Sequence, residues 1–344
     1  MDILFGVPQG SILGPILFLL FINDLPTCLQ KCECNLFADD TVIYTMNTDE
    51  LKATTDLIHN WITLNRLSLN IDNSCTMSVT NRSRNNPIFY INDNVLSSVT
   101  RTKYLGVTIC ENLSWEAQIK AVCSKMGYGI NVLYRLRQKK VAHKELLKIY
   151  NTIIQPYIDY CLTIWGYAPL CYINKIQRLQ NRIVRIITNN YDWNVSPAKL
   201  LIKLGIMSIT QRRDYFMSIQ MFRCVQGTAP SYRIDRIEYS SNYNCYQTRL
   251  SNTSMLYVPK PRIEKFRQSF QYVGPILYNG LPKDVKGSTS LHGFKKNVKV
   301  ALQHLSFLYV IIYWTHYSWN INKILQTIAR FTLVDGKPIR LFLA

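Results

Sequence analysis

The sequence predicts an α+β protein in which a small antiparallel sheet with helices comes first and helical segments follow. Three observations support this fold class. Residues 1 to about 110 alternate helical and strand patterns, apolar residues recur every three or four positions from Trp115 onward, and 48% of the 344 residues are hydrophobic. A chain of this length and composition can form two or three globular domains.

The first 110 residues contain the predicted sheet and its flanking helices. We expect helices over 12–23 and 49–65, for which Ser11 and Thr48 are candidate N-caps. Turn residues and β-rich runs predict a hairpin over 34–45 and strands near 76–80, 88–92 and 103–109.

Three consecutive stretches after Trp115 have helical periodicity. The first, from Ile119 to Leu136, also contains the basic residues Lys120, Lys125, Arg135 and Arg137, and the second runs from Leu146 to Tyr157. In the third, one face is apolar from Ile173 to Ile187, and another face holds Lys175, Arg178, Arg182 and Arg185. Such a basic row suits contact with a phosphate backbone, although a solvated cationic face explains it about as well.

Two adjacent carboxylates, Asp39 and Asp40, lie at the tip of the predicted hairpin. An apolar strand ends at Ala38, and Thr41-Val42-Ile43-Tyr44-Thr45 reads as its partner. Aspartate is common in solvated turns, so this pair alone does not indicate a site. Carboxylates held on a rigid hairpin are, however, suitable ligands for Mg²⁺.

A second motif, Gly6-Val7-Pro8-Gln9-Gly10-Ser11, precedes the apolar run from Ile12 to Ile22. Proline and two glycines make a stiff turn whose backbone can approach a ligand closely. In this order and at this spacing, the turn and the Asp39-Asp40 hairpin resemble blocks of the reverse transcriptase of non-LTR (LINE-like, Jockey-like) retrotransposons.

The resemblance implies an RNA-directed DNA polymerase that uses two metal ions for nucleotidyl transfer. It implies Asp39 and Asp40 as catalytic Mg²⁺ ligands, and contacts to template and nucleotide from Pro8, Gln9, Gly10 and Ser11. The segment 103–109 resembles the primer-grip hairpin, and Tyr104, Leu105 and Gly106 are its primer-grip-like residues. Residues 61–70, 160–166 and 177–182 and the marker Tyr278-Asn279-Gly280-Leu281-Pro282 extend the match to about residue 304.

The resemblance also implies a division of the chain. Residues 1–110 would form a partial palm, an antiparallel sheet with helices, and residues 111–194 an all-α, thumb-like bundle. Residues 195–304 would form a mostly helical C-terminal region, and residues 305–344 match nothing in the family and are expected not to derive from it. The implied partners are an RNA template, a DNA primer and, in the intact parent, a deoxynucleoside triphosphate.

Two departures from the family predict that this chain alone is inactive. The family needs a further aspartate well upstream of the Pro-Gln-Gly turn, and Asp2 is too close to Gly6 to provide it. Asn73 also stands where the family usually has a lysine that acts as general acid. The alternatives are a non-catalytic nucleic-acid-binding remnant and a group II intron-type maturase polymerase.

The charge distribution favours a nucleic-acid partner. Residues 1–100 contain 5 of the 40 basic and 10 of the 21 acidic residues, a balance of −5; residues 101–344 contain the other 35 and 11, a balance of +24. The ten cysteines form no Cys-x-x-Cys pair and indicate reduced thiols. The sequence has no convincing signal peptide or membrane span, so we expect an intracellular protein, cytoplasmic or nuclear, that is not secreted. We also expect no small-molecule cofactor.

Overall fold

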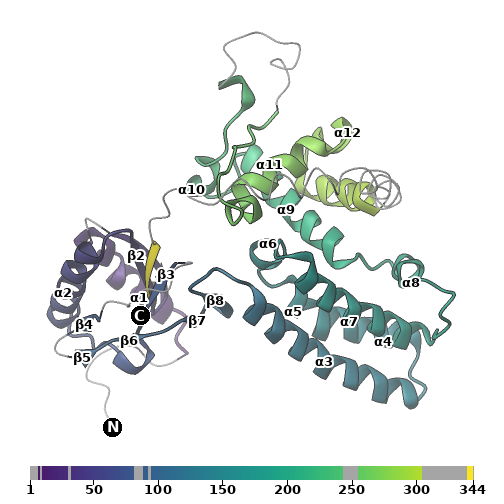
Figure 1. Ribbon diagram of the computed structural model, residues 1–344, viewed down its shortest axis with the longest axis horizontal. Coiled ribbons are helices and arrows are strands. Elements are labelled where there is room, and N and C mark those ends of the chain that lie inside the picture. The colour runs from purple at the N-terminus through teal and green to yellow at the C-terminus, as the bar shows by residue number, and fades with distance from the viewer. Residues whose placement is uncertain are drawn as a thin grey trace, which may run out of the picture. The chain divides into compact units, whose positions relative to one another are not determined.

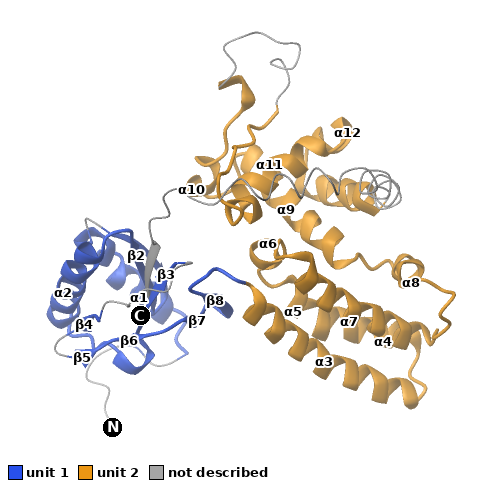
Figure 2. Cartoon of the chain, in the orientation of Figure 1, with its two compact units in different colours: residues 1–114, 333–344 blue, residues 115–332 orange. Residues whose placement is uncertain are grey.

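The computed structural model describes residues 7, 10–29, 32–80, 88–91, 94–242, 255–303 and 339–343 (Figure 1). The chain divides into two compact units, coloured separately in Figure 2. Unit 1 comprises residues 1–114 and 333–344, and unit 2 comprises residues 115–332. The sequence-based division at 110, 194 and 304 stays a prediction.

Unit 1 is built on a five-stranded sheet in the order β1-β2-β9-β3-β6. Its strands are β1 (Glu33–Phe37), β2 (Asp40–Thr45), β9 (Ile339–Leu343), β3 (Cys75–Val79) and β6 (Ser97–Ser98). The neighbouring strands are antiparallel, as predicted, except β3 and β6, which are parallel at the edge of the sheet. Two small hairpins complete the strands: β4 (Tyr90–Ile91) with β5 (Asn94–Val95), and β7 (Arg101–Tyr104) with β8 (Val107–Cys110).

Helices α1 (Gly14–Ile22) and α2 (Thr48–Leu64) flank this sheet, with short 3₁₀ turns at Leu25–Cys28 and Ile71–Asn73. Both predicted helices are confirmed, but both predicted caps were wrong. The N-cap of α1 is Leu13, because Pro15 suits the first turn and moves the helix start past Ser11. The N-cap of α2 is Asn47, whose side chain accepts a hydrogen bond from the amide of Asp49.

Two apolar clusters form the core of unit 1. One lies under the sheet and includes Ile43, Leu51, Ile58 and Leu96; the other joins Ile22 and Leu25 to Trp61. Much of α1 remains exposed, including Ile16 and Leu20 at 53% and 70% of their maximal area.

Helices dominate the described residues of unit 2, as the periodicity after Trp115 predicts, and one isolated β-bridge joins Tyr239 to Leu256. Its long helices are α3 (Glu116–Gln138), α7 (Leu170–Thr188), α9 (Ile209–Val225) and α11 (Phe270–Gly280). A further helix occupies residues 291–303. The shorter elements are α4 (His143–Ile149), a π-helix (Tyr150–Ile154), α5 (Gln155–Asp159), α6 (Leu162–Trp165), α8 (Pro197–Lys203), α10 (Ser231–Ile234), α12 (Lys283–Lys286) and 3₁₀ turns at Ser240–Asn242 and Phe266–Gln268.

Two cores divide unit 2. The first, between α3, α7 and the π-helix, centres on Met126, Leu133, Tyr150, Trp165 and Ile183, none more than 1% exposed. The second joins α9 to α11 and the helix at 291–303, where the rings of Phe222 and Phe294 stack 4.1 Å apart. These closely packed interiors fix the helix surfaces on which the charged residues lie.

A buried amide network ties α7 to its neighbours. Gln180 is fully buried; its side-chain amide donates to the Tyr150 hydroxyl and to the carbonyl of Met207. Gln177 donates to Gln180 and accepts from the amide of Ile209. The motif at 177–182 therefore contributes to folding through the side chains of Gln177 and Gln180.

Candidate active site

The two predicted catalytic carboxylates lie at the β1–β2 turn. Phe37 pairs with Asp40, which leaves Ala38 and Asp39 as a two-residue turn. Ala38 has a φ of 51°, the positive value that such tight turns require at their first position. Both carboxylates are exposed, and the paired strands on either side fix their position.

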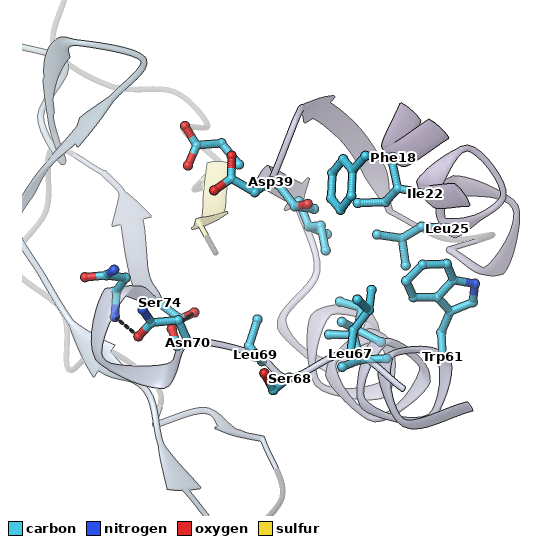
Figure 3. A pocket seen from close by; sticks show the side chains of 16 residues that line it. Phe18, Ile22, Leu25, Asp39, Trp61, Leu67, Ser68, Leu69, Asn70 and Ser74 are labelled. Carbon is cyan, nitrogen blue, oxygen red and sulfur yellow. Dashed lines mark hydrogen bonds between the residues drawn. The ribbon is translucent and has the colours of Figure 1, made fainter. Parts of the chain in front are cut away.

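Asp39 and Asp40 line a cavity of about 330 Å³ in unit 1 (Figure 3). One end of the cavity is apolar and is formed by Phe18 and Ile22 of α1 with Trp61 of α2. The other end is polar, where Asn70 and Asn73 accompany the carboxylates. The cavity therefore has an apolar wall and a negatively charged mouth.

Among the described residues, no basic side chain neutralises the charge of this mouth. Those that line the cavity include neither Lys nor Arg. In the part of the chain that the structure describes, neither Asp39 nor Asp40 forms a salt bridge. Two adjacent acids without a basic neighbour favour a bound cation.

The predicted primer-grip hairpin approaches the same carboxylates. Leu105 and Gly106 form the two-residue turn between β7 and β8, and their φ values of 44° and 79° identify a type I′ turn rather than a bulge. Burial raises the pKa of the Tyr104 hydroxyl, and the charges of Asp40 and Cys34 raise it further. Tyr104 and Asp40, 64 positions apart in the sequence, therefore lie within electrostatic reach of each other.

The oxygen donors at the cavity mouth fit part of a magnesium site. Mg²⁺ is usually held by one or two carboxylates together with waters and substrate phosphates. Asp39 and Asp40 can provide the carboxylates. Among the described residues, however, no group of three or more His, Cys, Asp or Glu side chains is placed to hold a metal.

The position next to the hairpin is filled by β9. This strand pairs with β2 on one side, from Val42↔Leu343 to Thr45↔Arg340, and with β3 on the other, from Cys75↔Leu343 to Val79↔Ile339. Strands β2 and β3 are thus separated by one strand from the far end of the sequence. That strand, Ile-Arg-Leu-Phe-Leu, adds no acidic residue beside Asp40.

The structure describes only part of the Pro-Gln-Gly turn. Pro8 and Gln9 lie outside the described residues. Gly10 adopts a φ of 87°, as its place in a tight turn predicts, but neither Gly10 nor Ser11 lines the cavity. Their proposed contacts with template and nucleotide stay predictions.

The predicted basic residues lie on helix surfaces in unit 2. Lys175, Arg178 and Arg182 form an exposed row along α7, and Lys120, Lys125 and Arg135 are exposed on α3. Arg137 is half-buried. The α3 residues do not share one face, because their spacing does not follow the helical repeat.

Arg185 has a different local role from the rest of the α7 row. Its guanidinium donates to the carbonyls of Asn190, Asp192 and Val195 and lies 5.9 Å from the ring centre of Trp193. These contacts close the loop after α7. We therefore define the α7 row as Lys175, Arg178 and Arg182, without Arg185.

Several residues that line the cavity were not among the predicted site residues. Phe18, Ile22 and Trp61 occupy what the sequence presents as ordinary apolar positions of helices. Asn70 could be detected only as part of a turn; its side chain accepts a hydrogen bond from the amide of Asn73 (Figure 3).

Comparison with known proteins identifies sequence relatives of this chain. Residues 3–109 match the family model described as reverse transcriptase (RNA-dependent DNA polymerase). The chain is 30% identical over 198 residues to the RNA-directed DNA polymerase from mobile element jockey of Drosophila funebris, which covers 53% of this chain and 22% of that protein. It is 28% identical over 216 residues to the probable RNA-directed DNA polymerase from transposon X-element of Drosophila melanogaster, covering 59% and 24%.

The chain thus spans less than a quarter of the length of these curated relatives. No solved structure gives a significant match. Within the described residues, every helix is too short or too polar to cross a bilayer.

Proposed function

The chain contains a reverse transcriptase region of the type found in LINE-like mobile elements, and we propose that it acts in RNA-directed DNA synthesis with Asp39 and Asp40 as divalent-metal ligands. The observation that supports this most strongly is the hairpin itself. The turn residue Asp39 and the first residue of β2, Asp40, lie at the mouth of a cavity whose described lining residues include no basic side chain.

The chemistry assigned to each group follows from its position. A bound magnesium would supply Lewis-acid activation of the primer 3′-hydroxyl and charge neutralisation at the leaving pyrophosphate. Asp39 and Asp40 supply oxygen ligands. Tyr104, held near Asp40 by its hairpin, positions the primer terminus.

We further propose that this site is incomplete in the isolated chain. The cavity mouth has two carboxylates, and β9, which occupies the neighbouring place in the sheet, has none. Asn73 lines the same cavity and cannot protonate a leaving pyrophosphate. Both features favour nucleic-acid binding without efficient nucleotide addition.

Unit 1 is proposed to correspond to part of the palm, and α3 and α7 in unit 2 to the thumb. The support is the exposed row of Lys175, Arg178 and Arg182 on α7, a layout that suits contact with a duplex backbone. The net charge of +24 over residues 101–344 agrees with this assignment. The alternative of a purely nucleic-acid-binding protein uses the same surface but requires no metal.

One experiment tests whether the site is complete in this chain. The purified full chain is mixed with a labelled DNA primer on an RNA template, in Mg²⁺ with all four deoxynucleotides, and both binding and extension are measured. We expect salt-sensitive binding without extension. Robust extension that disappears in Asp39→Ala and persists in Asp56→Asn, an exposed carboxylate on α2, would show that the site is complete after all.

A further inference from the structure

A second cavity, of about 210 Å³, lies within unit 2 at the start of α11. Its walls come from α6, α9, α10 and the first turn of α11. The polar groups among its lining residues are all neutral or positively charged: they include Gln220, Arg233, Arg236, Ser269 and Gln271.

Two arginines give this cavity its charge. No Asp or Glu lines it, and among the described residues neither Arg233 nor Arg236 forms a salt bridge. The guanidinium carbon of Arg233 lies 5.8 Å from the ring centre of Phe270 and 6.0 Å from that of Tyr232. These aromatic contacts restrict the orientation of a half-buried cation.

The beginning of α11 adds further donors. The first amide groups of any helix have no acceptor within the helix, and the helix dipole makes this end positive. Ser269 is the N-cap residue, but its side chain makes no capping hydrogen bond. Its hydroxyl oxygen is buried and has no partner among the described residues. An unsatisfied buried hydroxyl is costly and indicates a missing hydrogen-bond partner.

We propose that this cavity binds one phosphate group. Arginine guanidinium groups match the geometry of phosphate oxygens, and a helix N-terminus supplies amide donors to the same anion. A water occupies about 30 Å³, so the cavity has room for a phosphate with several waters. An uncharged or cationic ligand would leave the two arginines without a compensating negative charge.

The phosphate has two possible sources, a nucleic-acid backbone or a free phosphate compound. The proposed function favours the backbone, because a contact in unit 2 would add to the α7 row. Binding of phosphate itself does not depend on that function, since no residue of the Asp39 site takes part.

The first test measures the melting temperature of the full chain in 10 mM inorganic phosphate and in chloride at the same ionic strength. A site with a dissociation constant of about 1 mM raises the melting temperature by about 2–4 °C. Arg233→Gln combined with Arg236→Gln removes this shift, and the exposed Arg236→Gln alone reduces it. Arg262→Gln removes one positive charge outside the cavity, as Arg236→Gln does within it, and leaves the phosphate-dependent shift intact. An equal shift in the double variant, or none in the native chain, overturns the proposal.

The second test identifies the source of the phosphate. A fluorescent single-stranded RNA is titrated with the same variants at several salt concentrations. If the cavity takes a backbone phosphate, the double variant binds more weakly and the slope of log affinity against log salt falls by about 0.7. A phosphate-dependent shift with unchanged RNA affinity supports a free phosphate compound as the ligand of the same site.

Discussion

Asp40 and Tyr104 provide a residue-level test of the candidate active site. Burial and the charge of Asp40 both raise the pKa of Tyr104, so the folded chain favours the protonated phenol. The resulting stability is present below the ordinary tyrosine value of about 10 and is lost as the pH rises through the folded pKa. Asp40→Asn should therefore lower the pH at which Tyr104 ionises, as measured by the absorbance difference at 295 nm between each chain and its Tyr104→Phe variant.

Asp40→Asn leaves the contribution of burial in place, so the pKa of Tyr104 should stay above its usual value in that variant. Asp56→Asn, which removes a carboxylate from α2, should leave the ionisation of Tyr104 unchanged. If Asp40→Asn has no effect either, the two side chains are not close.

Asn279 supports a second residue-level prediction. Its side chain accepts a hydrogen bond of 3.0 Å from the amide of Leu256 and donates one of 2.8 Å to the carbonyl of the same residue. Asn279→Ala leaves both backbone groups unsatisfied and should reduce the free energy of unfolding by about 2 kcal/mol in urea denaturation. Asn297→Ala, which removes an exposed hydrogen bond to Ser288, should cost less than about 0.5 kcal/mol.

At the level of elements, short-range patterns predicted much of the fold. The β1–β2 hairpin was predictable because apolar runs flank an acidic turn, and α3 and α7 were predictable from their apolar spacing. The helix caps were misassigned because Leu13 and Asn47 compete with nearby residues of similar or better capping propensity. Arg185 looked equivalent to Arg178, but its bonds to the loop carbonyls depend on the path of the chain after α7.

The place of β9 could not be predicted, because strand pairing over nearly 300 positions has no local signal. It can be tested by cross-linking. Directly opposed residues on antiparallel strands have Cα atoms about 4.5–5.5 Å apart, within reach of a disulfide. Since Leu343 is opposed to Cys75, Leu343→Cys should form a disulfide with Cys75 under mild oxidation, detected by peptide mapping.

Phe342→Cys is the matched control for this cross-link, because residue 342 is opposed to Thr76 and Ile43. A disulfide to Cys75 in that variant at the same yield would place residues 339–343 elsewhere.

The exposed row on α7 gives a second element-level prediction. Arg178→Gln with Arg182→Gln should weaken binding to a primer–template duplex and reduce the salt slope by about 2, because each lost phosphate contact removes about 0.9. Lys203→Gln, on α8, should have little effect. Unchanged affinity and slope in the double variant would show that the α7 row is only a solvated cationic face.

At the level of the whole molecule, charge and architecture are distributed together. The acidic first hundred residues hold the carboxylate hairpin, and most of the basic remainder belongs to the helical unit with the α7 row and the arginine-lined cavity. This division lets one region attract cations while the other attracts phosphate. Composition predicted the division, whereas the cavities depend on side chains that only the folded chain brings together.

The most direct test of this account is Mn²⁺ titration of the full chain, followed by electron paramagnetic resonance. We expect the native chain and Asp56→Asn to bind Mn²⁺ alike, and Asp39→Asn with Asp40→Asn to bind it at least about tenfold more weakly, because the proposed ligands are lost. Equal Mn²⁺ affinity in all three chains would show that the hairpin carboxylates do not hold a divalent metal.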